Sequence, residues 1–382
     1  MEVYFDNSAT TRCREEVAEL VMQMMIRDYG NPSALHLKGI QAENEVKSAS
    51  VAIAKTLHGL SKEIVFTSGG TESNNMAILG TAAARNREGK HIITTKIEHP
   101  SVRKTMQYLE ENGYRITYLD VDTNGHIDLD TFRSALTAET ILVSIMMVNN
   151  EVGYMLPIKE IGELIRTSGY HPTFHVDAIQ AYGKLPIHVK NLGIDLLSVS
   201  GHKINGPKGI GFLYIKSGTK IRPVTYGGGQ QKGMRSGTLN VPGIAGIGLA
   251  AKLAYEEMES RTQQLVSLKS ELAKRLKKMG AVINTPIEYS APQILNISFK
   301  GIRSEVLLHA LEEKEIYVSS GSACASNHPS DNSTLKNQGI STEITDASVR
   351  ISLGMYNHKE EVDYMISCLH TVVPILQKFS RR

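Results

Sequence analysis

The sequence predicts an α/β fold in which a mainly parallel sheet carries helices on both faces. Short apolar runs alternate with segments of helical period along roughly the first two thirds of the chain. Several of these runs are apolar on both faces, as strands buried between two helical layers are. The chain has 382 residues, 41% of them hydrophobic, which is enough for a large core and a second, smaller unit.

Seven runs are predicted as strands of the sheet. They are residues 63–68 (EIVFTS), 90–95 (KHIITT), 115–121 (RITYLDV), 140–148 (TILVSIMMV), 173–178 (TFHVDA), 195–200 (DLLSVS) and 209–215 (GIGFLYI). Between the fourth and fifth runs, Ile158, Ile161 and Ile165 recur at helical spacing, and Gly169 follows as a C-terminal capping residue. This alternation is typical of strands joined by crossover helices.

The character of the chain changes after about residue 245. A long, charged helical stretch over 245–280, either one bent helix or two, is predicted to bridge to a smaller α+β unit that ends in a helix over 359–379. We therefore expect a large domain at 13–255 and a small domain formed by 1–12 and 256–382. Within the latter, 324–347 is rich in Ser, Thr and Asn, which predicts a long mobile loop of functional importance.

Composition excludes several classes of function. Lys and Arg number 42 and Asp and Glu 39, so the formal net charge of +3 gives no support to binding of nucleic acid or of a membrane surface. The three cysteines, Cys13, Cys324 and Cys368, have no metal-ligand spacing, so no metal site is predicted. Their small number and the absence of a signal-peptide pattern in MEVYFDNSAT predict a cytoplasmic protein.

Polar residues follow the predicted strands at the edge where open α/β sheets bind ligands. The turn Gly69–Gly70 precedes Thr71, a natural N-cap, and is suited either to a phosphate or to capping alone. The remaining candidates after strands are His99, Asn149, Asn150, Asp177, Gln180, Ser200, His202 and Lys203. Taken singly, each has a structural alternative, such as an N-cap for Asp177 or a role in satisfying backbone groups for the two asparagines.

Lys203 lies among glycines in SVSGHKINGPKGIG, where it could grip a phosphate or react with a carbonyl. A P-loop requires Gly-Lys followed by Ser or Thr, and here Pro207 and Lys208 follow Gly206. The alternative is a lysine that forms a Schiff base. Together with the glycine turn and Asp177, Lys203 would supply the three elements that pyridoxal 5′-phosphate (PLP) requires.

The motifs FTSGGTESNN, TKIEHPSV, VNNEVG, HVDAIQ, SGHKINGPKGIG, RSGT, SSGSACAS and VRISLG occur in that order along nearly the whole chain. As a set they resemble those of the cysteine desulfurases, which are class V PLP enzymes of fold-type I. The resemblance implies a large domain with a mainly parallel seven-stranded sheet and a smaller α+β domain. The motif SSGSAC resembles the one that carries the reactive cysteine of the family.

The resemblance also implies roles for individual residues. Lys203 would hold PLP as a Schiff base, His99 would stack on its ring, Asp177 would pair with the ring N–H and Gln180 with the ring hydroxyl. The phosphate would be held by Gly70, Thr71, Ser200 and His202, and by Thr238 of a neighbouring subunit in a homodimer. The substrate carboxylate would be held by Asn150 and Arg350, with Asn31 nearby.

Two of these residues are also open to ordinary structural interpretations. In SVRISL the strand alternation places Arg350 on one face with Ser348 and Ser352, a pattern that equally fits a solvent-facing arginine. An amino-acid substrate needs a bidentate guanidinium clamp, and the resemblance favours that role. A cysteine is commonly a small buried residue, but Cys324 opens the polar segment, where an exposed thiol suits a nucleophile.

The implied reaction converts L-cysteine to L-alanine. Lys203 or His99 would move the α-proton, and the Cys324 thiolate would take the substrate sulfur as a persulfide and pass it to an acceptor, such as an iron–sulfur scaffold or a tRNA-thiolation enzyme. A selenocysteine lyase or a class V aminotransferase is the alternative enzyme, and a sulfur-relay scaffold is the alternative without catalysis. The sequence names neither the acceptor nor the preference between cysteine and selenocysteine.

Overall fold

The computed structural model describes residues 1–320 and 334–380. Its centre is a seven-stranded sheet in which each strand coincides with one of the seven predicted runs. The strand order is β2 (Ile64–Thr67), β8 (Gly211–Ile215), β7 (Leu196–Ser200), β6 (Thr173–Asp177), β5 (Thr140–Met146), β3 (His91–Thr95) and β4 (Arg115–Leu119). β8 runs antiparallel to β2 and β7, and the other neighbouring strands pair in parallel. The predicted mainly parallel α/β fold is therefore confirmed.

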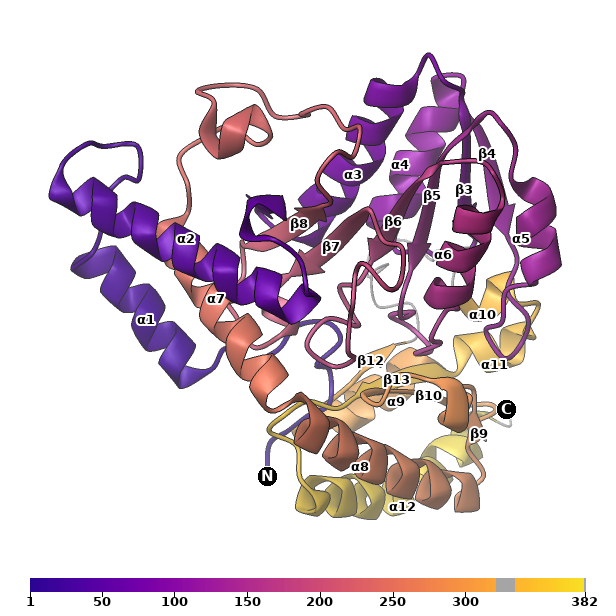
Figure 1. Cartoon of the computed structure of the whole chain (residues 1–382). Coiled ribbons are helices and arrows are strands. Elements are labelled where there is room, and N and C mark those ends of the chain that lie inside the picture. The colour runs from indigo at the N-terminus through magenta and orange to yellow at the C-terminus, as the bar shows by residue number, and fades with distance from the viewer. Residues whose placement is uncertain (321–333, 381–382) are drawn as a thin grey trace.

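Helices cover both faces of this sheet (Figure 1). On one face, α3 (Gly70–Arg85) and α4 (Pro100–Glu111) pack against strand residues such as Ile92 and Leu142. On the other, α6 (Ile158–Thr167) and α7 (Val241–Glu256) pack against the adjacent positions Ile93 and Val143. Successive strand residues point to opposite faces, so apolar side chains on both faces produce the buried parallel strands that the sequence indicates.

Three further helices belong to the large unit, and the last of them packs against α6 and β4 with Phe132 in the shared core. They are α1 (Glu15–Ile26), α2 (Leu37–Leu57) and the short α5 (Leu129–Ala135). Helices α1 and α2 both pack along α7.

The stretch over 245–280, predicted as one bent helix or two, is two helices, because α7 ends at Glu256 and α8 (Met258–Lys278) begins two residues later. In the described residues, no helix combines the length and the apolar character needed to cross a membrane.

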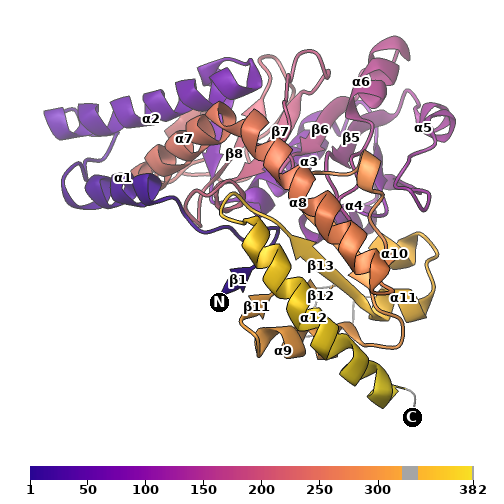
Figure 2. The ribbon, with the colours of Figure 1, turned by 90° about the horizontal axis from the view of Figure 1, so that it is seen from below.

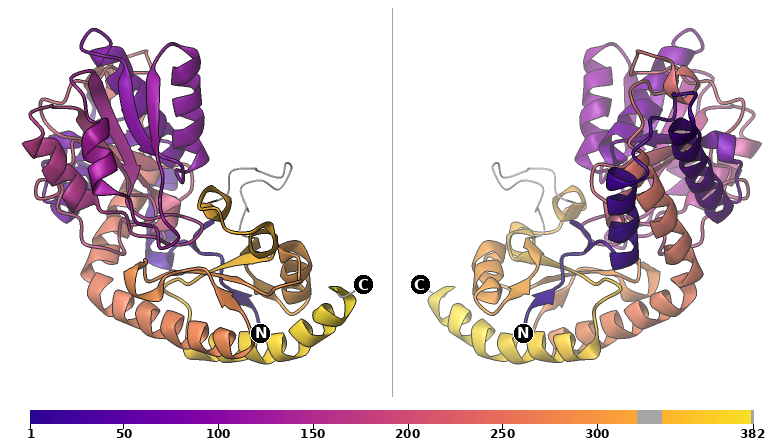
Figure 3. Two further views of the ribbon diagram at one scale, coloured as in Figure 1. Left: turned by 90° about the vertical axis from the view of Figure 1, so that its right-hand side faces the viewer. Right: turned by 90° about the vertical axis from the view of Figure 1, so that its left-hand side faces the viewer.

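A smaller unit lies beside the sheet edge (Figure 3). It contains a sheet of order β12 (Ser319–Ser320), β13 (Ser348–Ser352), β10 (Ile294–Ser298) and β9 (Val282–Ile283), and the parallel pair β1 (Val3–Tyr4) and β11 (Ile316–Tyr317). Its helices are α8, α9 (Ser304–Glu312), α10 (Thr334–Asn337), α11 (Thr342–Asp346) and α12 (Lys359–Ser380). Figure 2 shows α8 and α12 side by side along its outer surface.

This unit has a hydrophobic cluster of its own. The cluster joins Val3 and Phe5 at the N-terminus to Leu272 of α8, Ile351 of β13 and Leu369 of α12. Chain segments from both ends thus share one core, as expected for residues 1–12 and 256–382. The separate clusters support the division into two domains at residue 255, which stays a prediction.

The predicted long mobile loop over 324–347 needs correction in its second half. Residues 334–347 contain the two short helices α10 and α11, with Thr334, Leu335 and Ile344 buried. Leu335 packs into the core of the large sheet. A few apolar anchors in a polar segment are enough to fold it when a larger core receives them. Residues 324–333 lie outside the described residues.

Candidate active site

A cavity of about 340 Å³ lies at the carboxyl edge of the large sheet, where the smaller unit and the N-terminal segment meet it. Ten of the thirteen predicted site residues line this cavity. They are Gly70, Thr71, His99, Asn150, Asp177, Gln180, Ser200, His202, Lys203 and Arg350. The parallel strands β3, β5, β6 and β7 all end at this edge, which brings together residues more than a hundred positions apart in the sequence.

Lys203 is the last residue of the short 3₁₀ helix η2 (Gly201–Lys203), directly after β7. Its ammonium group donates hydrogen bonds to the backbone oxygens of Ser8, at 2.5 Å, and Ala9, at 2.7 Å. The N-terminal segment therefore holds the lysine amine at the wall of the cavity. Lys208, the other lysine of the motif, does not line the cavity.

The glycine turn after β2 reaches the cavity at Gly70, which lines it. Gly69 has φ +153°, which a side chain rarely tolerates, and a Cβ on Gly70 would lie 2.2 Å from the side chain of Ile179. Thr71 is not the N-cap that the sequence predicts, because α3 begins at Gly70 and Gly69 occupies the cap. Thr71 instead lies in the first helical turn, where unpaired backbone N–H groups favour an anion.

Asp177 ends β6 and is buried, with an exposed fraction of 4%. Its two oxygens accept hydrogen bonds from the Ile179 backbone N–H at 3.0 Å and the Asn74 amide at 2.8 Å. Burial raises the pKa of the Asp177 carboxyl, while these donors and nearby His99 and Lys203 oppose the rise. A buried carboxyl in this state gains from a cationic partner in the cavity.

Two histidines face the cavity as neutral imidazoles. Burial lowers the pKa of His99, and Lys203 and Arg103 add to this, whereas Asp177 acts in the opposite direction. Burial, together with Lys203 and two other lysines, lowers the pKa of His202 to about 4. His202 also makes a 3.1 Å hydrogen bond through Nδ1 with the Thr10 hydroxyl.

Gln180 is buried, and the nitrogen and the oxygen of its side-chain amide differ in their contacts. Its Nε2 donates to the backbone oxygen of Ser8 at 3.0 Å. Its Oε1 has no hydrogen-bond partner among the described residues. A buried acceptor without a partner costs free energy, so Oε1 suits a ligand hydroxyl.

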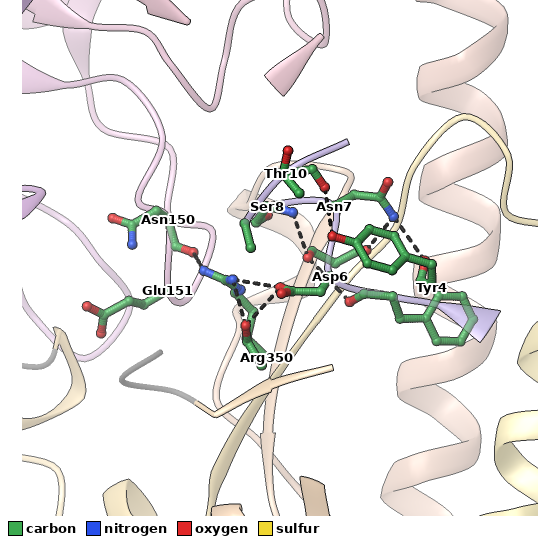
Figure 4. Close-up of polar contacts among 12 residues, drawn as sticks. Tyr4, Asp6, Asn7, Ser8, Thr10, Asn150, Glu151 and Arg350 are labelled. Carbon is green, nitrogen blue, oxygen red and sulfur yellow. Dashed lines mark hydrogen bonds and ion pairs between the residues drawn. The ribbon is translucent and has the colours of Figure 1, made fainter. Parts of the chain in front are cut away.

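Arg350 reaches the cavity from β13 of the smaller unit, and Figure 4 shows it between Asp6 and Asn150. Its guanidinium donates at 2.8 Å to Asp6 Oδ1, at 2.8 Å to the Asn150 backbone oxygen and at 3.0 Å to the Ser319 hydroxyl. Its Nε has no partner among the described residues. The arginine is thus buried and oriented rather than solvent-facing, the arrangement that a carboxylate clamp requires.

Three predicted residues are not placed in this cavity. Asn31 and Thr238 are exposed, and Asn31 accepts a 3.0 Å hydrogen bond from the Ser33 backbone N–H. Cys324 lies outside the described residues. Asn149, which the sequence also marked, has the structural role, because its Oδ1 accepts from the backbone N–H groups of Glu151 and Val152.

The sequence did not identify several residues of the site. Ser8 and Ala9 line the cavity, Asp6 pairs with Arg350, and Asn74 and Ser101 stand behind Asp177 and His99. Asn74 lies five residues into a helical segment and Ser101 follows a proline, so neither stands at a strand end. Their positions relative to the cavity follow from how α3 and α4 pack together.

Comparison with known proteins places the chain in a family. The family model for class-V aminotransferases matches residues 3–365. The cysteine desulfurase IscS of Dictyoglomus turgidum is 41% identical over 381 residues, which cover 99% of this chain and 96% of the relative. The cysteine desulfurase IscS of Klebsiella pneumoniae is 45% identical over 386 residues, which cover 100% and 95%.

Solved structures agree. A NifS-like protein superimposes with a TM-score of 0.94 at 39% sequence identity, covering 98% of this chain and 100% of that one. The NifS-like protein of Rickettsia africae gives a TM-score of 0.88 at 32% identity, covering 98% and 100%. SspA, solved in complex with cysteine, gives 0.81 at 36% identity, covering 93% and 100%. The chain therefore belongs to the cysteine desulfurase family of the class-V aminotransferase group, whose members depend on PLP.

Proposed function

We propose that this protein is a PLP-dependent cysteine desulfurase that converts L-cysteine to L-alanine and moves the sulfur through Cys324 to an acceptor protein. The observation that carries the proposal is one cavity that contains a lysine amine, a buried carboxyl and an oriented guanidinium, supplied by Lys203, Asp177 and Arg350. The curated relatives are named as cysteine desulfurases, and one structural neighbour binds cysteine.

The residues of the cavity fit PLP. Asp177, whose pKa is raised by burial, would be matched by a protonated pyridine nitrogen, and the unpartnered Gln180 Oε1 by the ring hydroxyl. The first turn of α3 with Gly70 and Thr71, together with Ser200 and His202, would hold the phosphate. When bound to Lys203, the cofactor supplies an electron sink that weakens the bond between Cβ and sulfur in the substrate.

The protein's own groups then have distinct tasks. Arg350 and Asn150 bind the substrate carboxylate and so orient the α-proton toward the sheet wall. Lys203 Nζ, which lines the same cavity, would accept that proton from Cα. The pair Arg350–Asp6 keeps the guanidinium in place before substrate arrives.

The proposed role of Cys324 is supported by the described residues on either side of residues 321–333. On the entering side, Ser319–Ser320 forms β12, which pairs with β13 at Arg350. On the leaving side, Thr334 is hydrogen-bonded to Glu151 at 2.8 Å and to Asn149 at 3.0 Å. Both sides of the segment are therefore anchored next to the residues proposed to bind substrate.

The decisive experiment is Cys324→Ser, tested with L-cysteine and with L-selenocysteine. The variant should keep the yellow colour of bound PLP, form no protein persulfide and produce no alanine from L-cysteine above background. Cys368→Ser is the matched control and should behave as wild type. Alanine formation from L-cysteine at the wild-type rate in Cys324→Ser would overturn the persulfide route.

The other outcomes separate the alternatives. Survival of only the selenocysteine reaction in Cys324→Ser supports Cys324 as the sulfur acceptor, because selenium leaves more readily without a thiol. Wild-type transamination with no alanine from cysteine would indicate an aminotransferase. A colourless protein that stays colourless with added PLP would indicate a sulfur-relay scaffold.

We further propose a homodimer in which Thr238 reaches the phosphate site of the partner. Thr238 is exposed and lies outside the cavity of its own chain. Large apolar side chains are exposed on and near α1 and α2, including Tyr29, Leu35 and Leu37, and Leu35 has an exposed fraction of 97%. Light scattering on the purified protein tests the dimer.

Two further points stay predictions from the sequence. They are the acceptor, which could belong to iron–sulfur assembly or tRNA thiolation, and the cytoplasmic location.

A further inference from the structure

A chain of hydrogen bonds runs behind the cavity wall and connects Asp177 to His99 through two residues. The Asn74 amide donates to Asp177 Oδ2 at 2.8 Å and to the Ser101 hydroxyl at 2.9 Å. The Ser101 hydroxyl lies 2.8 Å from His99 Nδ1. Asn74 is fully buried, Ser101 is 8% exposed and Asp177 is 4% exposed, so water does not replace these contacts.

The direction of each bond near His99 follows from one unambiguous donor. The Ser101 backbone N–H also points at His99 Nδ1, at 3.1 Å, and a backbone N–H can only donate. His99 Nδ1 is therefore an acceptor and carries no proton. The Ser101 hydroxyl, which already accepts from Asn74, has its own hydrogen free to donate to the same nitrogen.

The orientation of the Asn74 amide is set by Asp177. A carboxylate accepts hydrogen bonds, so the nitrogen of the amide, not its oxygen, must face Asp177 Oδ2. The oxygen Oδ1 is left buried with no partner among the described residues. Leaving an acceptor unpaired costs free energy, which indicates that the two donated bonds determine this arrangement.

We infer that Asn74 and Ser101 are positioning residues that keep the single proton of neutral His99 on Nε2 and link the histidine to Asp177. The inference rests on the proposed function, because it assigns a protonation state to that same site. It gives His99 a definite task. The ring presents an N–H donor to the cavity at Nε2, so it cannot accept the substrate α-proton there. Lys203 is then the residue that accepts it.

The charges around His99 are consistent with a neutral ring. Burial is the main reason that the pKa of His99 is lowered; Asp177 opposes this effect, and Lys203 and Arg103 add to it. The neighbouring Glu98 adds little negative charge near neutral pH, because burial raises the pKa of its carboxyl to about 8. His99 is also the N-cap of α4, which keeps a positive ring at that helix end unfavourable.

The direct test is nitrogen-15 NMR of the PLP-loaded enzyme labelled at histidine. The chain has 13 histidines, and His99→Gln identifies the signals of His99. We expect a protonated-type shift for Nε2 and an unprotonated-type shift for Nδ1 across the neutral pH range. A protonated-type Nδ1 in the wild-type protein would overturn the inference, and this readout does not depend on desulfuration.

Variants then test the two positioning residues. Ser101→Ala removes one donor to Nδ1 and should raise the minor tautomer roughly fivefold, so that the two nitrogen shifts move toward each other. Ser101→Thr keeps the hydroxyl and should restore the wild-type shifts. Ser73→Ala is the matched control, because it deletes a buried hydroxyl from α3 that bonds to Thr67 instead. Unchanged His99 shifts in Ser101→Ala would refute the role of Ser101.

Asn74→Leu tests the link to Asp177. It should shift the pH dependence of the PLP absorption band and should change the His99 shifts less than Ser101→Ala does, since the Ser101 hydroxyl remains. In steady-state kinetics, Ser101→Ala should lower kcat about three- to tenfold with KM unchanged. If the wild-type protein shows the expected His99 shifts but does not turn over cysteine, the proposed function is wrong and the tautomer assignment still holds. An absorption band in Asn74→Leu that titrates as in wild type would refute the link.

Discussion

The two walls of the cavity are built in different ways. The sheet wall, with His99, Asp177 and Lys203, comes from the ends of β3, β6 and β7 in one continuous sheet. Its polar groups are held by bonds within the large unit or to the N-terminal segment. The opposite wall joins Arg350 to Asp6, which is 344 residues away in sequence, and to the backbone of Asn150. Bond-breaking chemistry thus rests on a rigid sheet, whereas recognition of the substrate carboxylate depends on how the two units pack together.

The largest expected effect is on the sheet wall. Lys203→Ala should lose the borohydride-reducible link to PLP and lower kcat by more than about a hundredfold, because the α-proton loses its acceptor. Peptide mass spectrometry after reduction locates the link in the wild type. Lys208→Ala is the control and should retain the link. PLP found attached at Lys208 would contradict the assignment and place the chemistry away from β7.

Asp177→Asn should mainly weaken cofactor binding. Loss of a buried charged partner typically costs about 2–5 kcal/mol, so PLP affinity should fall roughly thirtyfold or more. The measurement is a spectroscopic titration of the PLP-free protein with PLP. Asp195→Asn is a fitting control, because Asp195 lies at the opposite end of the same sheet, where it pairs with Lys216. Equal PLP affinities in the two variants would show that Asp177 is only structural.

The recognition wall should respond in substrate affinity. Arg350→Lys loses the planar pair of donors, which we expect to cost about 1.5–3 kcal/mol in kcat/KM, mostly through KM. If the two walls have separate functions, the PLP affinity of Arg350→Lys should stay at the wild-type value. Arg303→Lys, on the exposed surface of the smaller unit, serves as control. A fall in PLP affinity in Arg350→Lys, with KM unchanged, would show that the two walls are not separate in function.

The smallest effect concerns stability of the sheet wall in acid. His175 of β6 is fully buried between the hydroxyls of Ser144 and Ser198, and burial lowers its pKa to about 3. The unfolded chain takes up a proton near pH 6.5 and the folded protein does not. The contribution of neutral His175 to the free energy of unfolding is therefore complete above that pH. It declines as pH falls toward 3, by about 2 kcal/mol between pH 7 and 5.

Urea unfolding at pH 7 and pH 5 measures this difference. His175→Asn should reduce the difference between the two pH values, even where it lowers stability at both. A difference as large as that of the wild type would mean that other groups, such as His91 with its pKa lowered to about 4, carry the acid sensitivity.

Much of the sheet wall is predictable from sequence. The seven strand runs are short, several of them are apolar on both faces, and polar residues follow them closely, so His99, Asp177 and Lys203 could be identified before their distances were known. Thr71 was assigned to the cavity but misassigned as the helix cap, because glycine at position 70 can begin a helix as readily as it can turn the chain.

The recognition wall and the support behind the sheet wall were decided by tertiary structure. The alternation in SVRISL places Arg350 on one face of the strand but does not show whether that face meets solvent or the cavity. The packing of β13 beside the sheet edge turns Arg350 toward Asp6 and the cavity. Asn74 lies in α3 and Ser101 in α4, and nothing in their sequence spacing indicates that the two side chains contact each other. The physical reason is range. Strand and turn patterns are local properties of the chain, whereas contacts between residues hundreds of positions apart depend on how the elements pack together.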